Sequence, residues 1–245
     1  MQHETAISEL AVVPEMCVGC SARQLSVCAG VADCDMNELV ASITTGQFSA
    51  HETLAAEGDP ASAYFNIVEG AVKIFKLLPD GRQQIVGFLF AGDFVGLAVR
   101  DHYAYTAEAI TMTRTCRFER RRLEKLMTRF PAMEQRLRDL ASDELAVAQE
   151  QMLSLGRKTA MERVAAFLLQ LSRRAKRLGL DGNPVMLPMS RADIADYLGL
   201  TIETVSRVFT RLKTAGTIRL GAGHSVELLD TAKLAELGEG WRGLA

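Results

Sequence analysis

The sequence has 245 residues, a net charge of −2 and a hydrophobic content of 48%. A chain of this kind can bury one large core or two ordinary ones. Its N-terminus, MQHETAISEL, is polar and acidic where a secretory signal is basic and then apolar, and it has no unbroken stretch of 18 apolar residues. We therefore expect a cytoplasmic protein with no membrane partner.

The charge is distributed unevenly along the chain. Residues 156–220 hold twelve Lys and Arg against five Asp and Glu, a net charge of +7. The rest of the chain holds sixteen basic against twenty-five acidic residues, a net charge of −9. A basic segment on an acidic body is typical of a DNA-binding module joined to another domain, although a solvated surface of mixed charge gives the same count.

Three thiols lie close together in the stretch MCVGCSARQLSVC, within residues 1–34. Cys17, Cys20 and Cys28 have C-x2-C-x7-C spacing, and Gly19 eases the bend between the first two. In a reducing compartment such a group is more often a metal or redox site than a set of disulfides, and the total of five cysteines fits poorly with full pairing. The spacing alone suits structural zinc and an iron–sulfur cluster equally, with Cys34 as the nearest further thiol.

Residues 35–130 read mainly as short strands. Alternating apolar runs such as YFNIVEGAVKIFKLL and QQIVGFLFAGDFVGLAV are interrupted by glycine and joined by PDGR at residues 79–82. Proline favours the first turn position and glycine accepts a positive φ, so this stretch predicts a hairpin turn. The pattern predicts an antiparallel sandwich or roll.

Residues 131–159 predict one long helix, because they contain no proline after Pro131 and no glycine before Gly156. Small and apolar residues recur there at alternating steps of four and three, as in a coiled-coil seam. The pattern favours a dimer interface, and the alternative is a core helix that touches its own domain on both faces. The seam residues are Ala141, Leu145, Ala148, Met152 and Leu155.

Residues 160–245 predict a winged helix-turn-helix domain. After an amphipathic helix over residues 160–180, Ser190 is placed to cap a short helix that ends at Leu198. Gly199 then allows a tight turn, and Thr201 is placed to cap a second helix. The following stretch TIRLGAGHSVELL predicts the β-hairpin of the wing.

The second of these helices carries polar side chains suited to reading DNA. Glu203, Ser206 and Arg207 share one face near its N-terminus, the part of a helix-turn-helix that meets base edges. Arg207 can grip guanine, Glu203 can accept from a cytosine or adenine amino group, and Ser206 suits either. The alternative is that Glu203 and Arg207 form an ordinary helix-stabilising ion pair. Because they lie in a capped helix-turn-helix within a basic segment, the DNA-reading interpretation is favoured.

The stretch Glu203-Thr204-Val205-Ser206-Arg207, preceded by ADYLGLTI, resembles the E-x-x-S-R recognition helix of the CRP/FNR superfamily of bacterial transcription regulators. The order of the predicted elements is similar over essentially the whole chain. The resemblance implies an α+β fold, with a β-roll of the cyclic-nucleotide-binding type, a dimerisation helix and a winged helix-turn-helix. It also implies a homodimer that is not an enzyme, that binds an inverted repeat of double-stranded DNA with half-sites beginning TTGAT, and that contacts RNA polymerase.

The N-terminal cysteines resemble those of the FNR-type oxygen sensors with the wider spacing. This resemblance implies a [4Fe–4S] cluster, lost on oxidation, that is held by Cys17, Cys20, Cys28 and Cys116 and stabilises the dimer. Cys116 corresponds to the distant ligand at the end of the last roll strand, which leaves Cys34 spare. A regulator with a zinc or thiol-redox site is the main alternative. An electron-transfer protein is less favoured, because no ferredoxin-like cysteine run is present.

The same family often binds a cyclic nucleotide in the roll through an arginine and a serine. Here Tyr105-Thr106-Ala107 stands where Arg-Ser-Ala is expected, although the turn glycines Gly92 and Gly96 are present. Unless Arg100 replaces the missing cation, we expect no cyclic nucleotide to bind.

Overall fold

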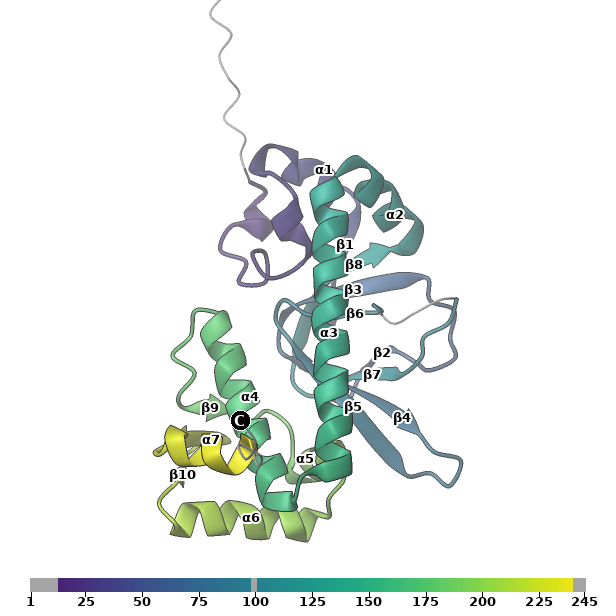
Figure 1. Cartoon of the computed structure of the whole chain (residues 1–245). Helices are drawn as coiled ribbons and strands as arrows, with labels where there is room; N and C mark the ends of the chain where they lie inside the picture. The colour runs from purple at the N-terminus through teal and green to yellow at the C-terminus, as the bar shows by residue number, and fades with distance from the viewer. Residues whose placement is uncertain (1–12, 98–100, 240–245) are drawn as a thin grey trace, which may run out of the picture.

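The computed structural model describes residues 13–97 and 101–239. Its axis is α3 (Pro131–Arg157), a single long helix. In Figure 1 the N-terminal segment and α2 (Arg120–Arg129) lie beside the start of α3. The β-roll lies along one side of this helix, and the C-terminal domain lies on the other side near its end.

The roll consists of two antiparallel four-stranded sheets, as the alternating pattern predicts. The strand orders are β1-β8-β3-β6 and β2-β7-β4-β5. The turn at residues 79–82 joins β4 to β5, which confirms the predicted hairpin. The strands are β1 (Ile43–Phe48), β2 (Thr53–Ala55), β3 (Ala63–Glu69), β4 (Ala71–Leu77), β5 (Gln83–Phe90), β6 (Phe94–Val95), β7 (Thr106–Ala109) and β8 (Thr113–Glu119).

Alternation along β3 assigns its side chains to two different cores. Phe65 and Ile67 point into the roll, whereas Tyr64 and Val68 pack outward against the N-terminal segment. That segment contains η1 (Glu15–Cys17), η2 (Val27–Gly30), η3 (Asp33–Asp35) and α1 (Met36–Val40). It covers the roll with a second apolar cluster, here called the outer core: Val27, Cys28, Val31, Met36, Leu39, Phe94, Cys116, Phe118, Leu123, Leu126 and Met133.

The long helix differs slightly from its predicted range of 131–159. It begins at Pro131, where a missing N–H costs nothing, and it ends at Arg157. Thr159 then accepts a hydrogen bond from the N–H of Glu162, whose side chain bonds back to Thr159 N at 2.7 Å. This capping box starts a new helix, α4 (Ala160–Arg177), and accounts for the earlier end of α3.

The C-terminal domain has the predicted winged helix-turn-helix elements. They are α5 (Arg191–Leu198), α6 (Ile202–Thr214) and the antiparallel pair β10 (Ile218–Leu220) and β11 (Ser225–Leu228). The structure adds β9 (Val185–Met186), which pairs with β11, and α7 (Thr231–Glu239), which packs on α4.

The roll and the C-terminal domain share part of one core. Phe75 and Ile85, from the two strands of the β4–β5 hairpin, belong to the cluster that also contains Leu168, Tyr197 and Val205 of the C-terminal domain. The hairpin thus docks directly on the helix-turn-helix. In the part of the chain that the structure describes, no helix combines the length and hydropathy needed to cross a membrane.

Candidate cysteine site and nucleic-acid interface

The N-terminal segment is held closely against the roll and the start of α3. Ser21 Oγ donates to the carbonyl oxygen of Val68 at 3.4 Å, and Arg136 of α3 donates to that of Leu25 at 2.6 Å. Gly30 lies so near α3 that a Cβ there would come within 2.5 Å of the Met133 backbone. The segment and α3 therefore meet in direct backbone contact.

Four of the five thiols lie in or near the outer core, and the fifth, Cys34 in η3, is exposed. Cys17 ends η1, and Cys20 follows the turn at Gly19. Gly19 has a φ of +70°, a left-handed conformation that glycine adopts without strain, as the sequence predicts for the bend between the two cysteines. Cys28 in η2 and Cys116 in β8 are buried in the outer core, and Cys17 packs against it.

The electrostatics of these thiols indicates that the four are neighbours. The pKa of Cys28 is raised to about 11, mainly by burial; the Ser26 hydrogen bond lowers it, and the charges of Cys17 and Cys20 add to the rise. The pKa of Cys116 is raised to about 12 by burial and, to a smaller extent, by the charges of Cys28, Cys20 and Cys17. Cys34 is exposed and acts on none of these values.

The four sulfurs are near one another without forming a finished metal site. Within residues 13–97 and 101–239, no group of three or more His, Cys, Asp or Glu side chains has the arrangement needed to hold a metal ion. The donor set fits a sulfur-ligated centre, because zinc and iron–sulfur clusters both take four thiolates. The assignment of Cys17, Cys20, Cys28 and Cys116 as ligands stays a prediction.

The helix-turn-helix forms from local signals that the sequence displays. Ser190 accepts from Asp193 N at 3.0 Å and starts α5. Gly199 ends α5 with a φ of +61°, and Thr201 accepts from Thr204 N at 3.2 Å to start α6. The cap and turn positions predicted for this motif are confirmed.

The predicted DNA-reading side chains are exposed on one face of α6. Glu203, Ser206 and Arg207 are all exposed, while Val205 and Val208 are buried. Among the described residues, Arg207 donates to Thr204 Oγ1 at 3.5 Å and forms no ion pair within 4 Å of Glu203. The charge of Arg207 still contributes to lowering the pKa of Glu203, after the hydrogen bonds at the start of α6, so the two side chains interact without a close ion pair.

The same face of α6 continues beyond the residues singled out in the sequence. A shallow surface pocket is lined by Ser206, Arg207, Thr210, Arg211 and Thr214. The last three follow Arg207 at three-, four- and seven-residue steps, so helical periodicity could have identified them. They extend the polar surface available to a DNA backbone.

The predicted dimer seam is mostly exposed in the single chain. Leu145 and Met152 are 59% and 65% exposed, and Ala141 and Ala148 are also exposed. Leu155 differs, since it is half-buried and its Cδ2 lies 2.9 Å from where a Cβ on Gly199 would stand. Leu155 thus packs against the turn of its own helix-turn-helix.

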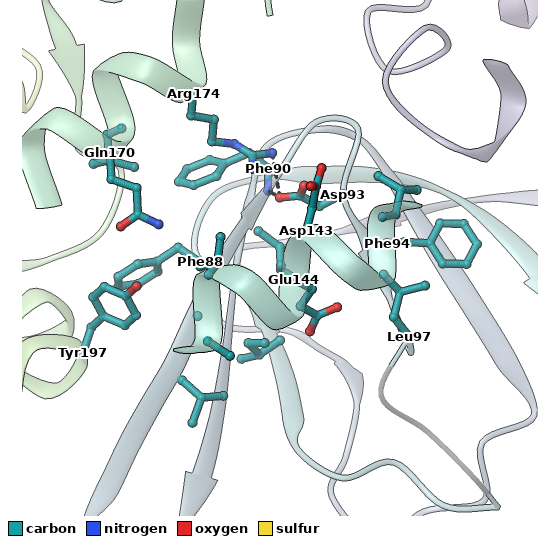
Figure 2. Close-up of a pocket in the computed structure, with 18 of the residues that line it drawn as sticks. Phe88, Phe90, Asp93, Phe94, Leu97, Asp143, Glu144, Gln170, Arg174 and Tyr197 are labelled. Atoms are coloured by element: carbon teal, nitrogen blue, oxygen red, sulfur yellow. Dashed lines mark hydrogen bonds and ion pairs between the residues drawn. The ribbon is translucent and has the colours of Figure 1, made fainter. Parts of the chain in front are cut away.

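A cavity of about 360 Å³ lies where the roll, α3 and the C-terminal domain meet (Figure 2). Its walls include Phe88 and Phe90 of β5, Glu144 of α3 and Arg174 of α4. Arg174 Nη2 lies 2.6 Å from Asp93 Oδ2, and its guanidinium lies 5.1 Å from the centre of the Phe90 ring. This cation is therefore already paired, and sequence inspection missed the pair because 81 residues separate its members.

Tyr105 occupies the position at which the roll of the resembled family carries a cation. Its hydroxyl accepts from Gly96 N at 3.1 Å, and the side chain is buried. The neighbouring Thr106 Oγ1 accepts from Glu57 N at 3.1 Å. Arg100, the alternative cation, lies outside the described residues.

Both halves of the chain match known domain families. Residues 162–237 match the Crp-like helix-turn-helix domain, and residues 45–130 match the cyclic nucleotide-binding domain. The first range falls in the C-terminal winged helix-turn-helix domain, and the second covers the strands of the β-roll and α2.

Several curated proteins are similar over most of their length. The nitrogen fixation regulation protein FixK of Bradyrhizobium diazoefficiens is 40% identical over 90% of this chain and 93% of its own. The transcriptional activator protein FnrL of Cereibacter sphaeroides is 38% identical over 94% of each chain. The transcriptional activator protein anr of Pseudomonas aeruginosa is 37% identical over 91% of this chain and 93% of its own.

Solved structures agree with these matches. FixK2 from Bradyrhizobium japonicum is 39% identical, with a TM-score of 0.74 over 80% of this chain and 96% of that one. A CooA mutant from Carboxydothermus hydrogenoformans is 20% identical with a TM-score of 0.68, over 82% of this chain and 90% of that one, and shares the fold.

Proposed function

The chain belongs to the CRP/FNR family of DNA-binding transcription activators, and we propose that it is an oxygen-responsive member of that family, controlled by a [4Fe–4S] cluster on Cys17, Cys20, Cys28 and Cys116. Its relatives are transcription regulators and not enzymes. The observation that carries the proposal is the grouping of these four thiols, three from the N-terminal segment and one from the roll.

A bound cluster supplies a centre that oxygen attacks and breaks. The chain's own part is to connect that centre to the dimerisation helix. Three ligands lie on the N-terminal segment, and the segment contacts the start of α3 through Gly30 and through the Arg136 bond to Leu25. When the segment is no longer tied to Cys116, we expect these contacts to loosen and the start of α3 to move.

Dimerisation through α3 would link the state of the cysteine site to DNA binding. The exposed seam, including Leu145 and Met152, offers an apolar surface for a second copy of the chain. Two recognition helices held at a fixed separation would read the two halves of an inverted repeat beginning TTGAT, while a lone protomer would keep only half of the contacts. Because the centre of the seam is apolar, we expect part of the protein to stay dimeric after the cluster is lost, so that the oxygen response is incomplete.

Activation also requires contact with RNA polymerase. The tip of the β4–β5 hairpin exposes Leu77 and Leu78 beside the turn at residues 79–82, with exposed fractions of 59% and 42%. We assign the polymerase contact to surface loops of this kind. A cyclic nucleotide has no place in the proposed mechanism, because Tyr105 fills the position of the missing cation.

The test is anaerobic purification followed by iron, sulfide and zinc analysis. Wild type should be coloured, contain iron and sulfide, and bind a TTGAT duplex as a dimer until air is admitted. Cys116→Ala should be colourless and bind weakly. Cys34→Ala is the matched control, because Cys34 is an exposed thiol of the same segment that the proposal leaves out of the ligand set, and it should behave as wild type.

A cluster-free protein that dimerises and binds the duplex with full affinity would refute the proposal. Zinc in place of iron would keep the regulator and remove the oxygen sensor.

A further inference from the structure

Asn66 is a buried polar side chain that the fold leaves without a partner. It is 1% exposed, and its Oδ1 atom has no hydrogen-bond partner. Oδ1 is an acceptor, so the Asn66 amide N–H, the donor end of the side chain, is the end that can reach an acceptor on a neighbouring strand. Native structures seldom bury an amide in this way, and an unpaired group of this kind calls for a partner that the free chain does not supply.

The strand register places Asn66 on the same face of the sheet as the thiols. It stands between Tyr64 and Val68 on β3, and both of these pack outward against the outer core. Directly opposite Asn66 lie Cys116 on β8 and Phe94 on β6. Cβ atoms of opposed residues are about 5 Å apart, so the amide and the Cys116 sulfur lie within reach of each other.

The other thiols approach the same spot. Ser21, which follows Cys20, donates to the carbonyl of Val68, two residues beyond Asn66. The surroundings are apolar, since the Tyr64 and Phe94 rings stack at 5.7 Å beside it. Of the two side chains directly opposite Asn66, only that of Cys116 carries a hydrogen-bond acceptor.

We propose that the Asn66 amide N–H donates a hydrogen bond to Cys116 Sγ when this sulfur binds the cluster, so that Asn66 tunes the cluster without being a ligand. The inference rests on the proposed function. A donor to a ligand sulfur stabilises the more negatively charged, reduced form of the centre and raises its reduction potential. The bond thus makes the centre harder to oxidise.

The experiment compares wild type with Asn66→Leu, which keeps the volume and removes the donor. The control is Thr115→Val, because Thr115 Oγ1 is equally buried and unpartnered but lies opposite Ile67, on the roll-interior face. Iron and sulfide are reconstituted anaerobically, and two quantities are measured: the midpoint potential and the rate at which visible absorption disappears at a fixed oxygen concentration. Asn66→Leu should have a lower potential and lose its absorption several-fold faster, and Thr115→Val should match wild type.

Urea unfolding of the cluster-free proteins separates tuning from folding. Cluster-free Asn66→Leu should be at least as stable as wild type, because it removes an unpaired buried amide. If it does not fold, Asn66→Ala is measured in the same way. An unchanged potential in a cluster-bearing variant overturns the inference alone, whereas a wild type that takes up no cluster overturns the proposed function and this inference with it.

Discussion

Lys73 Nζ in the roll lies 3.2 Å from Asp193 Oδ1 in the first turn of α5. The same ammonium lies 3.2 Å from Glu108 Oε1, and all three side chains are largely buried. Asp193 also accepts from Ser190 N at 2.9 Å, as part of the cap that starts α5. A single carboxylate thus starts the helix-turn-helix and attaches it to the roll.

Lys73→Met should loosen this attachment. It leaves two buried carboxylates without their cation, so the free energy of unfolding at pH 7 should fall by about 1–3 kcal/mol. The control is Lys76→Met on the same strand, where an exposed pair with Glu57 is lost and the change should stay below about 1 kcal/mol. Equal effects in urea unfolding of the two variants would contradict this account.

The pH dependence of the same pair has a definite sign. Burial raises the pKa of Asp193, but the Ser190 hydrogen bonds and the charge of Lys73 outweigh it and hold that pKa below its ordinary value. A carboxylate with a lowered pKa contributes stability above its unfolded pKa of about 3.9, and this stability is lost as the pH falls through the folded value. Lys73→Met should therefore flatten the acid side of the stability curve.

The sequence predicts the elements here better than their contacts. The caps at Ser190 and Thr201 and the turn at Gly199 depend on residues within three or four positions, so local patterns were enough. Lys73 and Asp193 are 120 residues apart, and no local pattern relates them. The site follows the same rule: the spacing of Cys17, Cys20 and Cys28 is visible locally, while Cys116 could be assigned only through the family resemblance.

Arg163 of α4 links the end of α3 to the helix-turn-helix. Its guanidinium donates to the carbonyl oxygens of Leu155 at 2.8 Å, Lys158 at 2.9 Å and Leu198 at 2.7 Å. Arg163→Met should keep the dimer but free the recognition helix to reorient. We expect a loss of about 2–4 kcal/mol in the free energy of unfolding and a weaker affinity for the inverted repeat.

The check combines sedimentation with binding to single and paired half-sites. Arg173→Met is the control, because Arg173 is exposed on the same helix. Arg163→Met should lose more affinity for the paired site than for the single half-site. Equal losses would show that Arg163 does not orient the two domains.

Glu144 makes stability fall as the pH rises through neutrality. Burial and the charge of Asp93 raise the pKa of Glu144 to about 7. The cavity also holds Asp143 and Arg174 (Figure 2), and Arg177 is a further charged residue of its lining. A carboxyl whose pKa is raised in the folded state contributes stability below its unfolded pKa of about 4.3, and that stability is lost as the pH rises through about 7. Glu144→Gln removes this loss.

Chemical unfolding at two pH values tests the role of Glu144. Near pH 8, Glu144→Gln should be about 1–3 kcal/mol more stable than wild type, and near pH 4 the two should agree. Glu150→Gln on the same helix loses only a surface pair with Lys158 and should show no such gain. A gain of the same size at both pH values would point to packing rather than ionisation.

Leu145→Asp should separate the protomers without unfolding them. Leu145 is 59% exposed in the single chain, so the charge is solvated in a monomer and buried in the dimer. An unpaired buried carboxylate costs about 3 kcal/mol or more, which corresponds to a dimer dissociation constant roughly 100-fold higher. Analytical ultracentrifugation measures this constant, and Leu180→Asp, at a site 61% exposed outside α3, should leave it unchanged. Unchanged dimerisation of Leu145→Asp would place the interface elsewhere.

Arg207→Ala should change which DNA is bound more than how stably the protein folds. Its side chain is exposed on α6 and donates a long hydrogen bond to Thr204 at 3.5 Å, so the fold loses little. If the guanidinium grips one guanine, removing it costs about 1–3 kcal/mol of binding and abolishes discrimination at that base pair. Titration of TTGAT duplexes altered one base pair at a time measures this. Arg211→Ala, one turn further along the same face, should instead weaken all duplexes equally and reduce the salt dependence, as loss of a phosphate contact does. If Arg207→Ala weakened every duplex equally, Arg207 would be a backbone contact and not a base reader.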